Sequence, residues 1–116
     1  MNDALLELLE RKRTLVTICE GKRDAAALRT LGFTRVMMLD APLYKVVERF
    51  EKGSTVQILT DLDREGRKLF AKLRSDFIQR GVRVDNELRE ALFRTQLRQI
   101  EGITSCVAST RISARF

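Results

Sequence analysis

The chain has 116 residues, of which 44% are hydrophobic and 33% are charged, and its net charge is +6. This length suits one domain with one hydrophobic core, the composition excludes a disordered chain, and no apolar run approaches the roughly 20 residues of a transmembrane helix. Histidine is absent, which excludes imidazole as a nucleophile, general base or metal ligand, and the excess of basic residues favours an anionic partner.

The first segment of the chain predicts an amphipathic helix. Residues from about Asp3 to Lys12 carry leucines on one broad stripe, the pattern of a helix that covers a sheet. Acidic residues precede these leucines and basic residues follow them, which is the reverse of the charge order in a secretory signal peptide. We therefore expect a cytoplasmic protein.

Short β-branched runs then alternate with longer segments of helical period, which is typical of βαβ units around a parallel sheet. Strands are expected over residues 15–19, 35–39, 55–60 and 82–84. Helices are expected over residues 22–31, 42–50, 65–80 and 86–100. This alternation predicts an α/β fold of three layers, in which helices cover both faces of a central parallel sheet of about four strands.

Two of these helices carry specific expectations. The helix over residues 65–80 is expected to be followed by Gly81 and to bury Leu69, Phe70, Leu73, Phe77 and Ile78. Asn86 is expected to cap one long last helix.

The end of the chain predicts an extension of the domain. The chain is expected to form a single domain over residues 1–116, with a core over about 14–102 and a C-terminal extension over 103–116. The extension, ITSCVASTRISARF, is β-leaning and ends basic. It could form an added edge strand, an arm that binds a protein partner, or a disordered end.

Acidic residues follow three of the expected strands. Glu20 follows the first, Asp40 the second, and Asp61 and Asp63 the third. Ligands of parallel α/β sheets bind outside the carboxyl ends of the strands, so Glu20, Asp61 and Asp63 are candidate site residues. Three carboxylates about 4 Å apart would repel one another by roughly 1 to 4 kcal/mol per pair, and a hard cation such as Mg²⁺ would offset this. Taken singly, an acid at such a position more often caps a helix or forms a turn, and it is the joint occurrence of the acids that favours a site.

The run DLDREG also imitates the start of a calcium-binding EF-hand loop. The twelfth position of such a loop would be Lys72, and a strand rather than a helix precedes the run. Phosphatases with a D-x-D motif place it after the first strand, where this chain has Glu20. Both alternatives are therefore disfavoured.

Two motifs together resemble a known family. ICEGKRDAAAL after the first strand and ILTDLDREGRKLF around the third are similar to the Toprim domain of topoisomerases, primases and ribosomal-RNA maturation nucleases. The resemblance covers about residues 15–100 and is greatest to small standalone Toprim proteins. It implies a Rossmann-like α/β fold. It also implies Glu20 as general acid or base, and Asp61 and Asp63 as ligands of Mg²⁺, or of Mn²⁺ in its place. Glu65 matches a further acidic position of the topoisomerase versions and is a candidate metal ligand, as is Glu20.

Small and basic residues surround these acids at the expected helix starts, where anions are favoured. Glycine would let the backbone approach a phosphate closely. A solvated helix face is the alternative interpretation of the basic residues. The candidate nucleic-acid-binding residues are Gly21, Lys22, Arg23, Arg64, Gly66, Arg67 and Lys68.

The function expected from this resemblance and from the charge is Mg²⁺-dependent phosphodiester chemistry on nucleic acid. A nuclease acting on RNA or structured nucleic acid is favoured, with RNA preferred over DNA, and no membrane partner is expected. The alternatives are a non-catalytic nucleic-acid-binding module and an accessory subunit whose partner binds the C-terminal extension.

Overall fold

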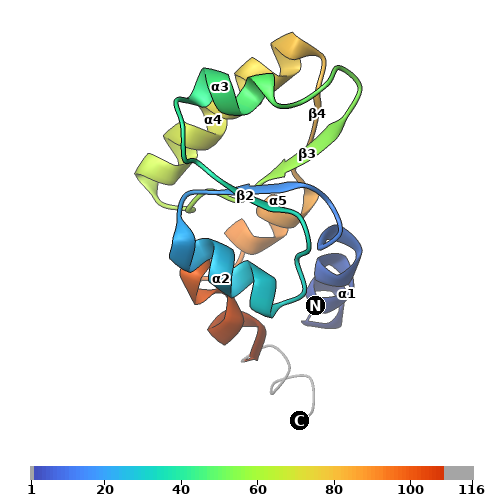
Figure 1. The fold of residues 1–116 in the computed structure, drawn as a ribbon. Helices are drawn as coiled ribbons and strands as arrows, with labels where there is room; N and C mark the ends of the chain where they lie inside the picture. Colours follow the sequence, from blue (N-terminus) through green and yellow to red (C-terminus); the bar gives the residue numbers. More distant parts are fainter. Residues whose placement is uncertain (1, 109–116) are drawn as a thin grey trace.

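The computed structural model describes residues 2–108, apart from the side chains of Asn2 and Asp3. Its centre is a parallel sheet of four strands in the order β2-β1-β3-β4 (Figure 1). The strands are β1 (Thr17–Cys19), β2 (Val36–Met38), β3 (Thr55–Ile58) and β4 (Arg83–Asp85). The expected α/β fold with a parallel sheet is confirmed.

Helices cover both faces of this sheet. They are α1 (Asn2–Lys12), α2 (Lys22–Thr30), α3 (Leu43–Glu48), α4 (Arg64–Arg80), α5 (Glu87–Phe93) and the short 3-10 helix η1 (Ile100–Gly102). Apolar side chains of α3 and α4 pack on one face, and those of α1, α2, α5 and η1 pack on the other (Figure 1). Adjacent residues of β1 serve both layers, since Ile18 belongs to the first core and Cys19 to the second.

The ends of α4 follow from its sequence. Asp63 is the N-cap, and its side chain accepts a hydrogen bond from the backbone N–H of Gly66. At the other end, Gly81 adopts φ +81°, a left-handed conformation that favours glycine. Ile78, which was expected to be buried in this helix, is instead 50% exposed.

The expected long helix from Asn86 is wrong, because α5 ends at Phe93. The Thr95 hydroxyl donates to the Leu92 carbonyl and accepts from the Leu97 N–H, so it competes with the helical pattern. The following segment is held elsewhere, since the Leu62 N–H donates to the Arg98 carbonyl. Asn86 makes no capping bond with its side chain; the Asp85 carboxylate accepts the Glu87 N–H instead.

The beginning of the C-terminal extension also differs from expectation. Residues 103–108 are helical, so the proposed edge strand is wrong for them. Ile103 and Val107 are buried in the same core cluster as α2 and α5. The remainder of the extension, 109–116, lies outside the described residues, so its role stays a prediction. Between residues 2 and 108, no helix has the length and apolarity to cross a membrane.

Candidate functional site

The first pair of site residues is joined across two strands. Because β1 and β3 are adjacent and parallel, Glu20 and Asp61 emerge at the same edge of the sheet. The Glu20 Oε2 accepts a hydrogen bond from the Asp61 N–H at 2.7 Å. The Glu-Gly turn after β1 is thereby bonded to the D-x-D loop after β3.

Asp61 binds a third part of the chain. Its Oδ1 accepts the backbone N–H of Ile100 at 2.8 Å. This bond, together with the Leu62–Arg98 backbone bond, draws the segment after α5 to the carboxyl end of β3. The segment that follows α5 therefore packs against the candidate site instead of continuing the helix.

Asp63 and Gly66 shape the start of α4. The Asp63 Oδ1 accepts the Gly66 N–H at 2.8 Å, and the buried Thr60 hydroxyl donates to the Gly66 carbonyl at 2.7 Å. A Cβ at Gly66 would overlap the backbone carbonyl of Asp61. Internal packing against Asp61 therefore requires glycine at this position.

Gly21 is different. Its backbone is extended, with φ −152°, a conformation open to any residue, and a Cβ there would meet nothing within 4 Å. Its N–H donates to the Asp24 Oδ2 at 3.2 Å at the start of α2. Neither backbone strain nor packing among the described residues demands glycine here, so the space above Gly21 is open to a ligand.

The acidic cluster consists of Glu20 and the three acids whose charges act on it, Asp24, Asp61 and Asp63. Burial raises the pKa of Glu20, and the nearby charges of Asp61, Asp24 and Asp63 raise it further, while the hydrogen bond from the Asp61 N–H acts against them. Burial and the charge of Asp61 likewise raise the pKa of Asp24. Glu20 is thus closer to exchanging protons near neutral pH than an ordinary glutamate.

Arg89 is a site residue that the sequence analysis missed. Its guanidinium donates to the carbonyls of Thr60 at 2.7 Å, Asp61 at 3.0 Å and Ile58 at 3.3 Å. It also lies 4.4 Å from the centre of the Phe70 ring. The side chain is only 6% exposed, and burial lowers its pKa to about 10, against the opposing charges of Glu20 and Asp61. The available signal was an arginine between the apolar positions 88 and 92 of one short helix.

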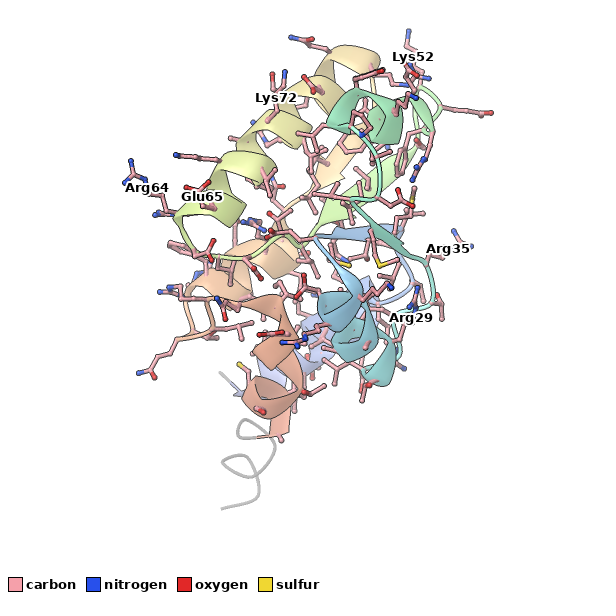
Figure 2. All side chains as sticks on the ribbon, turned by 60° about the vertical axis from the view of Figure 1, so that its left-hand side comes forward. Arg29, Arg35, Lys52, Arg64, Glu65 and Lys72 are labelled. Atoms are coloured by element: carbon pink, nitrogen blue, oxygen red, sulfur yellow. The ribbon has the colours of Figure 1, made fainter. Side chains whose placement is uncertain are left out.

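Other candidates stand apart from this cluster. Glu65 faces solvent with its side chain 79% exposed, and its nearest basic partner is Lys68 at 3.5 Å (Figure 2). Asp40 forms an exposed ion pair with Arg49 at 2.9 Å. The basic candidates lie exposed in the first turns of α2 and α4; they are Lys22, Arg23, Arg64, Arg67 and Lys68.

The chain is similar to archaeal proteins. It is 31% identical to the UPF0292 protein of Methanocaldococcus jannaschii, a match that covers 90% of this chain and 91% of that protein. The chain belongs to the UPF0292 family. A UPF0292 protein of Thermococcus gammatolerans is 37% identical over 84% of this chain and 77% of its own length. No family model matches the chain.

A solved structure shares the fold. A protein from Aquifex aeolicus superposes with a TM-score of 0.75 and 26% identity, covering 85% of this chain and 94% of its own. The four-stranded parallel sheet of this UPF0292 member therefore has a counterpart among solved structures.

The donor set of this UPF0292 chain suits a hard cation. Glu20, Asp61 and Asp63 offer only carboxylate oxygens, and each backbone hydrogen bond occupies one oxygen of its carboxylate. Within the part of the chain that the structure describes, however, no three acidic or thiol side chains are already grouped to hold a metal ion. The residues fit Mg²⁺ by their chemistry, and the carboxylates serve as acceptors for backbone N–H groups.

Proposed function

We propose that this protein is a metal-dependent enzyme of Toprim type that carries out phosphodiester chemistry on nucleic acid. A nuclease acting on RNA or structured nucleic acid is the favoured form. The observation that carries the proposal is the Glu20–Asp61 hydrogen bond, which joins the end of β1 to the D-x-D loop. The proposed substrate suits a cytoplasmic protein.

The three acids have two proposed roles. Asp61 and Asp63 would hold Mg²⁺ through the carboxylate oxygens that accept no backbone hydrogen bond. The bound cation supplies charge neutralisation at the phosphate and lowers the pKa of a coordinated water. Glu20 transfers a proton to or from the reacting oxygen, a role supported by its raised pKa.

The surroundings of these acids suit a polyanionic substrate. The N-termini of α2 and α4 both open toward this edge of the sheet, and exposed lysine and arginine side chains occupy their first turns. The open space above Gly21 leaves room for a phosphate close to the backbone. Arg89 acts as a positioning residue, since it holds the carbonyls of the loop that carries Asp61.

A second function is favoured by one observation. Glu20, Asp61 and Asp63 each already accept a backbone N–H, which is a structural task that needs no metal. A non-catalytic nucleic-acid-binding module would use them in this way alone. Binding to nucleic acid that survives EDTA, without turnover of any substrate, would favour this alternative or an accessory subunit.

The test compares matched acids at the ends of different strands. Labelled single-stranded and duplex RNA and DNA are incubated with the wild type and with Glu20→Gln, Asp63→Asn and Asp40→Asn, in Mg²⁺, Mn²⁺ or EDTA. We expect metal-dependent cleavage by the wild type and Asp40→Asn, and loss of at least about 100-fold in the other two. The amides keep an oxygen that accepts the same N–H, so the fold should survive. Cleavage that persists in EDTA, or equally in Glu20→Gln, would contradict the proposal.

A further inference from the structure

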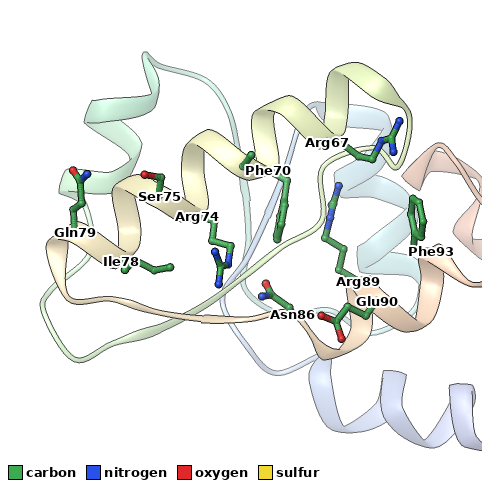
Figure 3. Close-up of a pocket in the computed structure, with 11 residues that line it drawn as sticks. Arg67, Phe70, Arg74, Ser75, Ile78, Gln79, Asn86, Arg89, Glu90 and Phe93 are labelled. Atoms are coloured by element: carbon green, nitrogen blue, oxygen red, sulfur yellow. The ribbon is translucent and has the colours of Figure 1, made fainter.

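A groove separate from the acidic cluster lies between α4 and α5. Its volume is about 810 Å³ (Figure 3). The two helices cover opposite faces of the sheet and flank β4, the edge strand, in sequence. The groove therefore lies beside the β4 edge of the sheet, and its wall includes Phe70, Ile78 and Phe93.

Exposed apolar surface is concentrated in this groove. Among the described residues, the large hydrophobic side chains that are exposed are Tyr44, Ile78 and Phe93. Ile78 at 50% and Phe93 at 43% both line the groove, while Tyr44 lies on α3. Exposed apolar side chains that gather in one concave surface indicate a binding site.

The charged residues of the groove are mostly basic. Arg67, Arg74 and Arg89 line it, against the single acid Glu90. Two guanidinium groups lie over the Phe93 ring, with their carbons 5.9 Å (Arg67) and 5.0 Å (Arg98) from its centre. Flat apolar rings beside guanidinium groups match the bases and phosphates of nucleic acid, because every base has a face that can stack and every phosphate is an anion.

Two residues that line the groove also contact residues of the acidic cluster. Arg67 lies in the first turns of α4, next to the Asp63 cap, and donates its own backbone N–H to the Asp63 carbonyl. Arg89 lines the groove and donates to the Asp61 carbonyl. The Arg67 end of the groove therefore lies beside the N-terminal cap of α4.

We propose that this groove binds a single-stranded segment of nucleic acid next to the site of chemistry. One base stacks on Phe93, and phosphates lie against Arg67 and Arg74. A single strand fits and a duplex does not, since the bases of a duplex stack on one another and present no free face to a side chain. The inference rests on the proposed function and names the form of its substrate.

Binding measured in EDTA tests this without turnover. Fluorescein-labelled oligouridine RNA of about 12 nucleotides and its duplex with oligoadenosine are titrated with protein, and anisotropy is recorded. We expect the single strand to bind more tightly than the duplex and Phe93→Ala to weaken it by at least about tenfold. Arg74→Ala should reduce the slope of log affinity against log salt by about 0.7. Tyr44→Ala and Arg35→Ala, matched exposed positions elsewhere, should bind like the wild type.

The absence of tryptophan from the chain allows a direct readout of stacking. In the Phe93→Trp protein, tryptophan fluorescence should be quenched by the single-stranded RNA, whereas in the Tyr44→Trp protein it should not. A groove that instead receives an acidic protein segment would leave RNA affinity unchanged in Phe93→Ala and give no quenching, and either result overturns the inference. If metal-dependent cleavage persists while Phe93→Ala binds normally, the groove assignment alone fails. If stacking is seen without cleavage, the proposed function alone fails.

Discussion

The Glu20 carboxylate accepts the backbone N–H of Asp61 at 2.7 Å, across 41 positions of sequence. One side chain thus fixes the distance between the turn after β1 and the loop after β3. The same carboxylate has a raised pKa and lies among other acids. Glu20 therefore combines a structural role that its oxygen performs with a chemical role that needs its charge and proton.

Substituting Glu20 in two ways separates these roles. Glu20→Ala should lower the free energy of unfolding by about 1 to 3 kcal/mol, because the Asp61 N–H loses its acceptor. Glu20→Gln keeps an acceptor and should remain within about 1 kcal/mol of the wild type. Urea unfolding followed by circular dichroism measures both. Equal midpoints for Glu20→Ala and the wild type would show that the bond contributes nothing to stability.

Substitution of the buried Arg89 should lower the free energy of unfolding more than substitution of the exposed Arg94 at the end of the same helix. Arg89→Met keeps the bulk but removes the donors to three carbonyls, and we expect a loss of about 2 to 4 kcal/mol. Arg94→Met is the control, because Arg94 is exposed at the end of α5, and its effect should stay within about 0.5 kcal/mol. Thermal unfolding compares the two, and similar melting temperatures would contradict the positioning role.

Substitution by alanine should affect a different property at each of the two glycines of the site, stability at Gly66 and affinity at Gly21. Gly66→Ala forces a methyl group onto the Asp61 carbonyl and should cost more than about 2 kcal/mol of stability. Gly21→Ala meets no neighbour and should cost at most about 1 kcal/mol, as an N-cap substitution. Its expected effect is on affinity for the nucleic acid, measured by anisotropy. If Gly21→Ala binds RNA like the wild type, no phosphate approaches this backbone.

Acid should weaken the link between α1 and the turn after β4. The Lys12 Nζ lies 2.8 Å from both the Asp85 and the Glu87 carboxylates. Burial acts to raise the pKa of Asp85, but hydrogen bonds from Lys12 and from the Glu87 N–H outweigh it and hold the pKa below 3.8. The stability that this lowered pKa provides is fully present above about pH 4 and is lost as the pH falls through the folded-state pKa.

Asp85→Asn measures that contribution. The variant should be about 1 kcal/mol less stable than the wild type at pH 7, and the difference should vanish as the pH falls through the folded-state pKa of Asp85. Asp40→Asn, which breaks only an exposed ion pair, is the control and should change little at either pH. A difference between Asp85→Asn and the wild type that stays the same at every acid pH at which both proteins remain folded would contradict this role of Asp85.

Local patterns in the sequence predicted the sheet and most helices, because periodicity, glycine stops and strand-end acids are local features. The break after Phe93 was not predictable in this way. The Thr95 hydroxyl bonds are local, but the course of the following segment depends on the Ile100 N–H reaching the Asp61 carboxylate, a contact made only in the folded chain. The burial of Arg89 and the exposure of Ile78 likewise depend on which face of each helix meets the β3–α4 loop or the groove.

The candidate site was predicted in part. Glu20 and Asp61 were expected at one edge of the sheet, and they are hydrogen-bonded there. Glu65, two residues after Asp63, is on the solvent face of α4, since residues in the first helical turn point in different directions. The metal itself stays a prediction, because the described residues contain no preformed group of three acidic or thiol side chains that would hold it.

Titration with Mn²⁺, followed by the electron paramagnetic resonance of the free ion, tests the central claim most directly. We expect the wild type and Asp40→Asn to bind Mn²⁺, with affinity that rises with pH as Glu20 loses its proton. Asp61→Asn and Asp63→Asn, which keep their backbone hydrogen-bond acceptors, should bind at least about tenfold more weakly. Equal Mn²⁺ binding by Asp63→Asn and the wild type, or no binding by the wild type, would contradict a metal site at these carboxylates.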